Sequence, residues 1–536
     1  MQADINRPLN ASGKAAFRIN AQVSNSGDPT DFVYRRDRWI APSPSLSLSL
    51  SLDLGPQTDL VLFATYSQSN WLRQQGMTPY GTVRPNRNGP VRTTLYTGDP
   101  GFGGYDIEST SVGYALEHRI SPQLTLRQNV RYESEKGNGN FVSNLALQSN
   151  QRLQNRQATR QYLDDDMLAT DTSLLSQFAA LGVQHRLVTG LDARTSHSWQ
   201  GQRRCTIGAL DVFNPVYGVA TSCPAAYTSN APEKLSVMGL YAQDQIKLNP
   251  QWTALVGLRR DWSDNQIDDR LANRQTRQKD SATTLSAGLV YEFTPGWAAY
   301  TSYGESFLPV SGTSFGGSPF APETGKQWEA GLKYEAPNGG LTGALALFDL
   351  KRRNVTTADP ANTGFSVQTG EQRARGLELE VGAELLRSLK LTGTYTYTYT
   401  YTYTYTYTYT DTYTDTDTDT DTKVTRDNNA AIVGLPLNLT PRHTLALWAT
   451  YKLPQMPQIT LGAGARYVSE QIGSYPFTLP AYTVADLSIG YAGANYRITA
   501  GVKNVFDKAY YDGAINANVV SPALPRSFSV GLTYFF

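Results

Sequence analysis

The first long polar stretch of the chain, residues 67–105, interleaves aromatic and basic side chains that suit ligand binding better than catalysis. Aromatic rings offer stacking surfaces, and a guanidinium beside a ring adds cation–π and ionic contacts to a bound anion. We therefore expect a mouth that grips an anionic or chelate ligand. Its aromatic members are Trp71, Tyr80, Tyr96 and Phe102, with Arg73, Arg84, Arg87 and Arg92 between them. For Tyr66 and Tyr105, beside predicted strands, we expect instead a place in an aromatic girdle at a membrane interface.

Patterns that would indicate catalysis or a metal site are weak. Residues 312–316 match the G-x-S-x-G nucleophile elbow, but no helical pattern follows the serine, as that motif requires. The Asp-Thr run at 411–422 begins like a calcium loop but lacks its essential Gly and Glu. His185 and His443 have no convincing serine partner, and the four histidines show no ligand spacing. We predict no catalytic residue, no metal site and no enzyme activity.

Two cysteines, Cys205 and Cys223, lie in a polar stretch between strong strand patterns. In an oxidising compartment they are expected to form a disulfide that closes one long loop. Two unpaired thiols are the alternative.

The elements that would position these residues are strands with two different faces. The last ten residues read S-F-S-V-G-L-T-Y-F-F, so the apolar residues Phe528, Val530, Leu532, Tyr534 and Phe536 share one face. Such a strand suits lipid on one side and a polar interior on the other. A strand that commits its final residue to the apolar face is typical of a transmembrane β-barrel, whose last strand pairs with its first.

Similar strands recur along the 536 residues, with short Pro-, Gly- and Asn-containing turns alternating with long connections such as 67–105, 134–171 and 196–234. That asymmetry is typical of outer-membrane barrels. We count roughly 21 strands where bacterial barrels prefer an even number, so one strand is expected to be missing. The 47 basic and 46 acidic residues, net charge +1, argue against a nucleic-acid surface. The predicted fold is all-β: a transmembrane antiparallel β-barrel.

Two dipeptide repeats interrupt the chain, Ser-Leu at 45–52 and Tyr-Thr passing into Asp-Thr at 394–422. Each has a period of two, so each can form a strand with one lipid-compatible face. The Tyr-Thr run exceeds the roughly 9–11 residues of a crossing strand, so its far end should enter water. Either both are expanded coding repeats of variable length, or they are harmless extensions of a tolerant strand end.

Several segments, in order along the chain, resemble TonB-dependent outer-membrane receptors of the ferric-siderophore branch, which includes ferrichrome-type receptors. They include residues 239–262 (G-L-Y-A-Q-D-Q-I-K-L-N-P-Q-W-T-A-L-V-G-L-R-R-D-W), 322–335 (P-E-T-G-K-Q-W-E-A-G-L-K-Y-E), 370–382 (G-E-Q-R-A-R-G-L-E-L-E-V-G) and 501–511 (G-V-K-N-V-F-D-K-A-Y-Y). Any one segment is modestly specific, and the ordered set is highly specific. The resemblance covers nearly the whole chain.

This resemblance implies a barrel of the 22-stranded type in the bacterial outer membrane, most simply a monomer in lipid. It implies a receptor for a ferric siderophore chelate, without a covalently bound cofactor, energised by the TonB–ExbB–ExbD complex. Phe536 would serve as the signal for the barrel assembly machinery. Residues 76–83 occupy the place of a loop that supplies aromatic ligand contacts in ferrichrome-type receptors, and Tyr80 matches that pattern.

The resemblance also implies that residues 1–536 are the barrel portion alone. The signal peptide, the coupling box and the plug domain have no counterpart in the chain, and residues 1–10 resemble the second barrel strand. We expect a truncated form that cannot carry out energised uptake alone. The alternative is a plugless, porin-like diffusion channel; an outer-membrane enzyme such as a phospholipase ranks lower.

Overall fold

The computed structural model describes residues 2–12, 14–22, 24–25, 27–33, 45–54, 57–72, 75–359, 362, 365–399, 423–426 and 436–536. Every regular element in these ranges is a β-strand. No helix among them is long and apolar enough to cross a membrane. The chain divides into two compact units, residues 1–248 with 255–285 and residues 249–254 with 286–536.

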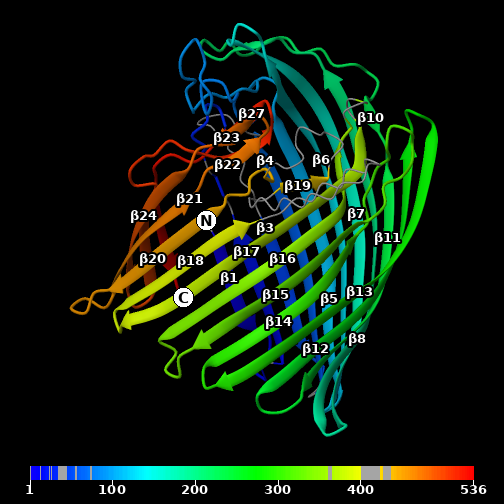
Figure 1. Ribbon diagram of the computed structural model, residues 1–536, viewed down its shortest axis with the longest axis vertical. Coiled ribbons are helices and arrows are strands. Elements are labelled where there is room, and N and C mark those ends of the chain that lie inside the picture. Colours follow the sequence, from blue (N-terminus) through cyan, green and yellow to red (C-terminus); the bar gives the residue numbers. More distant parts are fainter. Residues whose placement is uncertain are drawn as a thin grey trace, which may run out of the picture. The chain divides into compact units, whose positions relative to one another are not determined.

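In the first unit, successive long strands pair antiparallel with their neighbours along the chain (Figure 1). Its strands are β1 (Gln2–Pro8), β2 (Ala15–Gln22), β3 (Ser45–Asp53), β4 (Thr58–Trp71), β5 (Gly104–Ser121), β6 (Leu124–Leu147), β7 (Leu153–Ala180), β8 (Val183–Cys205), β9 (Leu210–Asp211), β10 (Ser229–Asn230), β11 (Glu233–Lys247), most of β12 (Trp252–Asp269) and the first part of β13 (Arg274–Thr294).

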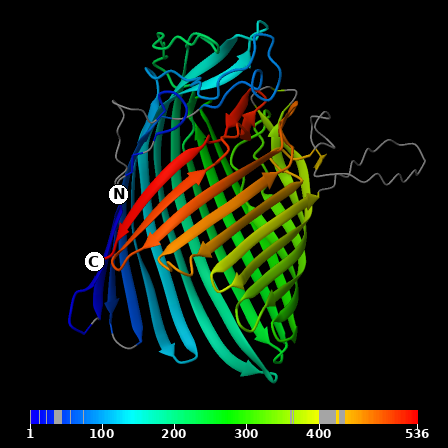
Figure 2. The same ribbon diagram turned by 90° about the vertical axis from the view of Figure 1, so that its left-hand side faces the viewer.

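The second unit continues the same pattern, and Figure 2 shows its last strands, in orange and red, side by side. Its strands are the end of β13, then β14 (Trp297–Leu308), β15 (Glu323–Glu335), β16 (Leu341–Ala358), β17 (Ser366–Leu386), β18 (Leu389–Tyr399), β19 (Lys423–Arg426), β20 (His443–Lys452), β21 (Ile459–Val468), β22 (Gln471–Ser474), β23 (Phe477–Leu479), β24 (Tyr482–Ala492), β25 (Tyr496–Lys503), β26 (Tyr511–Asn516), β27 (Val519–Pro522) and β28 (Ser527–Tyr534).

The pairing confirms the predicted all-β, antiparallel class. Among the described residues, 24 strands belong to the antiparallel sheet pairing, and β22–β23 and β26–β27 form two separate hairpins. The strands β9, β10 and β19 have only two to four residues. Without these three, the strand number agrees with the roughly 21 strands expected from the sequence.

Tight turns join strands at one end and long connections at the other. The turn between β7 and β8 places Leu181 and Gly182 at φ 52° and 80°, and Gly296, between β13 and β14, has φ 80°. Glycine reaches this left-handed region without a steric penalty, which allows the chain to reverse within two residues.

The prediction of a long loop at 134–171 was wrong, because most of it is strand. β6 and β7 remain paired in register from Leu124↔Ser176 to Asn144↔Arg156. With 24 and 28 residues they exceed the roughly 9–11 that cross a bilayer, so they extend beyond it as a ribbon. The side chains of these outer parts are mostly polar, which suits a strand in water. Arg73 and residues 400–422 of the second repeat lie outside the described residues.

One face of the sheet exposes large apolar side chains. In the second unit, Ile489, Ala500 and Val530 form one cross-strand row, and Ile489 and Val530 are 47% and 80% exposed. The first unit repeats this on β7, β8, β11 and β12 with Leu168, Leu191, Met238, Leu240, Val256 and Leu258. A contiguous apolar face of this extent cannot face water, so it is the surface that contacts lipid.

Replacing Ile489 by Arg should therefore destabilise the protein, by up to about 2–4 kcal/mol, the cost that a cation on the lipid face reaches at the bilayer midplane. Thr499 is the matched control, because it lies opposite Gly490, one residue further along, on the other face. Thr499→Arg should cost less than about 1 kcal/mol. Equilibrium urea unfolding in lipid vesicles measures both, and equal losses would contradict the assignment of the two faces.

Candidate ligand-binding site

The aromatic residues at the ends of β4, β5 and β6 form a stacked ladder. Trp71 and Tyr105 are register partners, and their rings lie 5.1 Å apart with an interplanar angle of 6°. Phe141 stacks on the other side of Tyr105 at 6.1 Å and 13°. Gly139, opposite Tyr105, leaves room for the ring, since a Cβ there would come within 2.4 Å of it.

The ladder lies on the face opposite the lipid surface. Tyr66 on β4 is 43% exposed on the same face as Leu62, whereas Trp71 is an odd number of residues away and points to the other face. Tyr105 is only 9% exposed, so the prediction that it is a girdle residue was wrong. Tyr66 occupies a position where a girdle residue would lie.

Tyr80 lies at the surface of the connection between β4 and β5, beside one of the interleaved arginines. The Arg84 guanidinium carbon is 5.1 Å from the centre of the Tyr80 ring, and its Nη1 donates to the Tyr80 hydroxyl at 3.4 Å. The local turn is closed by the Thr82 hydroxyl, which donates to the Thr78 carbonyl at 2.7 Å. This places a ring and a cation together at a partly exposed position.

Tyr96 and Phe102 instead lie in the core of the loop. Tyr96 is 1% exposed, and burial raises the pKa of its phenol well above the ordinary value. Phe102 is 9% exposed and packs with Val142, Ala158 and Cys205. A ligand reaches these two rings only if the loop rearranges, so in this arrangement they support the site and do not line it.

A buried carboxylate ties the first long connection to the loop between β8 and β11. Asp99, 1% exposed, accepts hydrogen bonds from the backbone amides of Gly101 at 2.9 Å, Gly218 at 3.0 Å and Val219 at 3.3 Å. Arg156, from β7, donates to the carbonyls of Gly98 at 2.8 Å and Gly208 at 3.0 Å. Hydrogen bonds to a charged group that is buried away from water are strong, so these contacts hold the two loops together.

Tyr217 adds a second link between the same loops. Its hydroxyl donates to the Tyr96 carbonyl at 2.7 Å, and its ring meets Phe32 edge-on at 4.9 Å. Burial raises the pKa of Tyr217 to about 12, so the phenol remains a neutral donor at neutral pH. The connection between β2 and β3 therefore joins the assembly through Phe32.

Two arginines that the sequence assigned to the mouth have structural partners. Arg87 donates to the carbonyls of Ser149 and, at 3.2 Å, Asn150, in the turn between β6 and β7. Arg92 forms an ion pair with Asp31 at 2.7 Å. Both arginines hold neighbouring connections in place. Among the described arginines of this set, Arg84 is the one that lies beside an aromatic ring.

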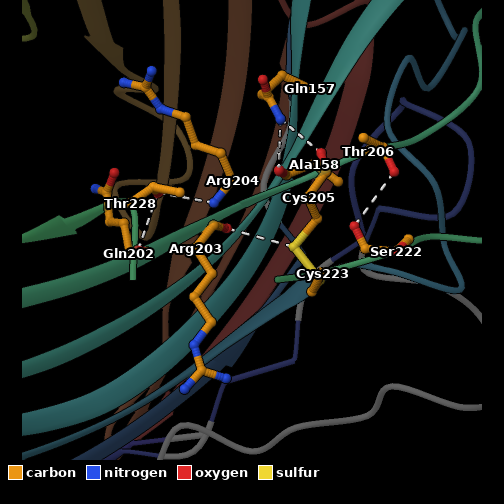
Figure 3. Close-up of a disulfide and its surroundings, with 10 residues drawn as sticks. All are labelled: Gln157, Ala158, Gln202, Arg203, Arg204, Cys205, Thr206, Ser222, Cys223 and Thr228. Atoms are coloured by element: carbon orange, nitrogen blue, oxygen red, sulfur yellow. Dashed lines mark hydrogen bonds between the residues drawn. A yellow bond between two sulfur atoms is a disulfide. The ribbon is translucent and has the colours of Figure 1, made fainter. Parts of the chain in front are cut away.

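The two cysteines lie at the end of β8 and in the connection between β8 and β11 (Figure 3). Cys205 ends β8, and its Sγ is 2.09 Å from that of Cys223, 18 residues later. Beside the disulfide, Thr206 and Ser222 exchange backbone hydrogen bonds of 2.8 and 3.1 Å. Figure 3 shows the Thr206 hydroxyl donating to the Ser222 carbonyl at 3.4 Å and the Gln157 amide donating to the Cys205 carbonyl at 2.6 Å. The disulfide thus closes the loop that carries Tyr217 and Gly218 to the first connection.

Asp99, Arg156 and Tyr217 were missed by the sequence analysis. Their partners are 119, 58 and 121 residues away, and no local pattern links them. The Asp-Pro-Gly turn at 99–101 was the available signal for a tight, carboxylate-capped loop.

At the other end of the chain, Phe536 is 77% exposed and its ring stacks on Tyr534 at 6.4 Å. Its role as an assembly signal stays a prediction. No three His, Cys, Asp or Glu side chains in the described ranges are grouped closely enough to hold a metal ion.

Comparisons with known proteins agree on one family. Residues 54–505 match the family described as TonB dependent receptor-like, beta-barrel. The metal-pseudopaline receptor CntO of Pseudomonas aeruginosa (strain UCBPP-PA14) is 29% identical over 99% of this chain and 72% of its own length. The ferrichrome outer membrane transporter/phage receptor of Escherichia coli (strain K12) is 30% identical over 83% of this chain, which spans 60% of that protein.

Solved structures show the same fold. The ferric-catecholate import receptor Fiu of E. coli K12 superposes with a TM-score of 0.82 at 20% identity, over all of this chain and 79% of that one. The ferripyoverdine receptor of P. aeruginosa, bound to ferripyoverdine, superposes with a TM-score of 0.81 at 18% identity, over 99% and 69%.

Replacing Asp99 by Asn should lower the free energy of opening the two loops by about 1.5–3 kcal/mol, because the buried amides lose a charged acceptor. The matched control is Asp31→Asn, which removes the exposed ion pair with Arg92 and should cost less than about 1 kcal/mol. Hydrogen exchange of the amides at 95–103 and 217–219 measures the opening free energy. Equal protection in the two variants would show that Asp99 does not hold the loops together.

Proposed function

Because the chain belongs to the TonB-dependent receptors, the β-barrel receptors of the bacterial outer membrane, we propose that it captures ferric siderophores at the Trp71–Tyr105–Phe141 ladder and the Tyr80–Arg84 pair. In a receptor that also carries the coupling box and the plug, passage of the chelate inward is then energised by the TonB–ExbB–ExbD complex of the inner membrane. The family name implies the coupling to TonB; the choice of cargo is our proposal.

The stacked ladder is the observation that carries this proposal. Tyr105 is covered on both sides by the stack, so the outer faces of Trp71 and Phe141, on the face opposite the lipid, are the polarizable surfaces on which a planar group of a chelate can stack. Arg84 supplies a cation beside Tyr80 and complements a chelate with net negative charge. The relatives support this class of cargo, since their names refer to metal-pseudopaline, ferrichrome and ferrioxamine B.

The buried loop core explains how the rings could bind without a large ordering cost. Asp99, Tyr217 and the disulfide hold the first long connection in one arrangement before a ligand arrives. A preorganised site loses less conformational entropy on binding, so more of the stacking energy appears as affinity.

Trp71→Ala and Tyr80→Ala should each weaken binding by about tenfold or more, ~1.4 kcal/mol, as expected when an aromatic anchor is truncated. The matched control is Tyr66→Ala, on the same strand as Trp71 but on the lipid face, which should leave affinity unchanged. A panel of ferrichrome, ferrioxamine B and ferric pyoverdine, tested by calorimetry with purified protein, provides the measurement.

A chelate that binds the Trp71→Ala and Tyr80→Ala variants as tightly as the unmodified protein would place the site elsewhere. No binding by any member of the panel, in protein whose strand content by circular dichroism is intact, would contradict siderophore capture itself.

A further inference from the structure

A polar pocket lies on the lipid-contacting face of the first unit, where β7, β8, β11, β12 and β13 extend beyond the apolar band. An open pocket of about 660 Å³ is formed there. Its lining combines one tryptophan with carboxylates, amides and cations: Asp164, Asp166, His197, Trp199, Glu233, Lys234, Gln266, Asp268, Arg270, Gln275 and Arg277.

Strand alternation places this pocket on the same side as the lipid-contacting residues. Asp166 is two residues from Leu168, His197 is six from Leu191, and Lys234 is four from Met238, so each pair shares a face. At about 3.3 Å per residue, the pocket begins roughly 7–20 Å beyond the last apolar side chains. It therefore opens at the level of the membrane head groups and just above them, facing away from the chelate site.

Trp199 is held as a fixed wall of the pocket. Its indole Nε1 donates to the Asn230 side chain at 2.9 Å, and the Tyr227 ring meets it edge-on at 5.9 Å. An aromatic ring that is fixed on two sides offers a rigid apolar surface at low entropic cost, next to groups that can form hydrogen bonds.

The polar groups around Trp199 carry charges of both signs; Arg277 is held by a bidentate ion pair with Asp264, whereas three other ion pairs at the lining are long. Four carboxylates face three cations in the lining. The ion pairs Lys136–Asp164 and Arg270–Asp268 both measure 3.4 Å, and His197–Asp166 measures 3.6 Å, all between side chains that are 42–65% exposed. Exposed ion pairs of this kind contribute little to the free energy of folding. A ligand with many hydroxyls can therefore replace their contacts at a small cost in free energy.

This chemistry selects one class of ligand. A phosphate or sulfate group would need an excess of cations, and an acyl chain would need an apolar lining. A ring with apolar C–H faces and several hydroxyls fits both the tryptophan and the mixed donors and acceptors. We propose that this pocket binds neutral saccharide units of a surface glycan, independently of the imported chelate.

The test measures fluorescence anisotropy of labelled neutral hexose trimers to pentamers with the purified full chain in detergent. A second arm presents the same oligosaccharides on a lipid anchor in nanodiscs that contain the protein. Binding in the first arm indicates a soluble glycan as the source, and binding only in the second indicates a membrane-linked one; both support the proposal.

Trp199→Ala and Asp268→Asn should each weaken this binding by about tenfold, and Trp199→Phe should retain most of it. The matched control is Trp262→Ala, on the same face of β12 but outside the pocket, which should change nothing. All four variants should keep the ferric-chelate affinity, which separates this site from the proposed function.

Two results would overturn the inference. One is that no neutral oligosaccharide binds in either arm, or that binding survives both Trp199→Ala and Asp268→Asn. The other is a clear preference for phosphorylated or sulfated oligosaccharides over neutral ones, which would show that the pocket recognises anions.

Discussion

The constraint on which this structure depends is that a strand in lipid must satisfy its backbone hydrogen bonds with another strand. Antiparallel pairing does this residue by residue, and the continuous registers of β14 with β15 or β21 with β24 show it over the whole length of the shorter strand. Once every backbone group is paired, side chains have only two directions to point. The lipid face and the polar face, and therefore the placement of the recognition residues that stand on strands, follow from that pairing.

Loops beyond the membrane are not bound by this rule, and there the chain uses different chemistry. Water competes for each hydrogen bond, so a stable arrangement needs buried contacts of its own. Asp99 and Arg156 supply charged partners to backbone groups of several loops, and Tyr96, 1% exposed, supplies the apolar core. The Cys205–Cys223 disulfide restricts the loop that brings Gly218 to Asp99. The result is a small folded assembly that depends on side chains, joined to a sheet that depends on its backbone.

This difference between strands and loops explains which parts of the structure could be predicted from the sequence. Strands were predictable because alternation and Pro- or Gly-containing turns are local signals, and the final strand was recognised from ten residues. The ribbon of β6 and β7 was misread as a loop, because polar alternation without an apolar face looks the same in a long loop. The loop core could not be predicted at all: whether Tyr96 is buried or faces a ligand depends on Tyr217, which is 121 residues away. Composition alone had placed Tyr96 and Phe102 in the same set as Trp71 and Tyr80.

The length of β7 connects the two recognition surfaces. Of its 28 residues, roughly 9–11 suffice to cross the bilayer, so the remainder projects outward. Near its outer end Arg156 holds the loops of the Asp99 assembly together, and further down, on the same face of the strand, Asp164 and Asp166 line the pocket beside Trp199. The Trp71–Tyr105–Phe141 ladder lies on the other face of the sheet, so a side chain in the pocket can change without touching a ring of the ladder. A long strand outside the membrane therefore gives the chain room for a second site beside the loop assembly, which a strand trimmed to the bilayer could not do.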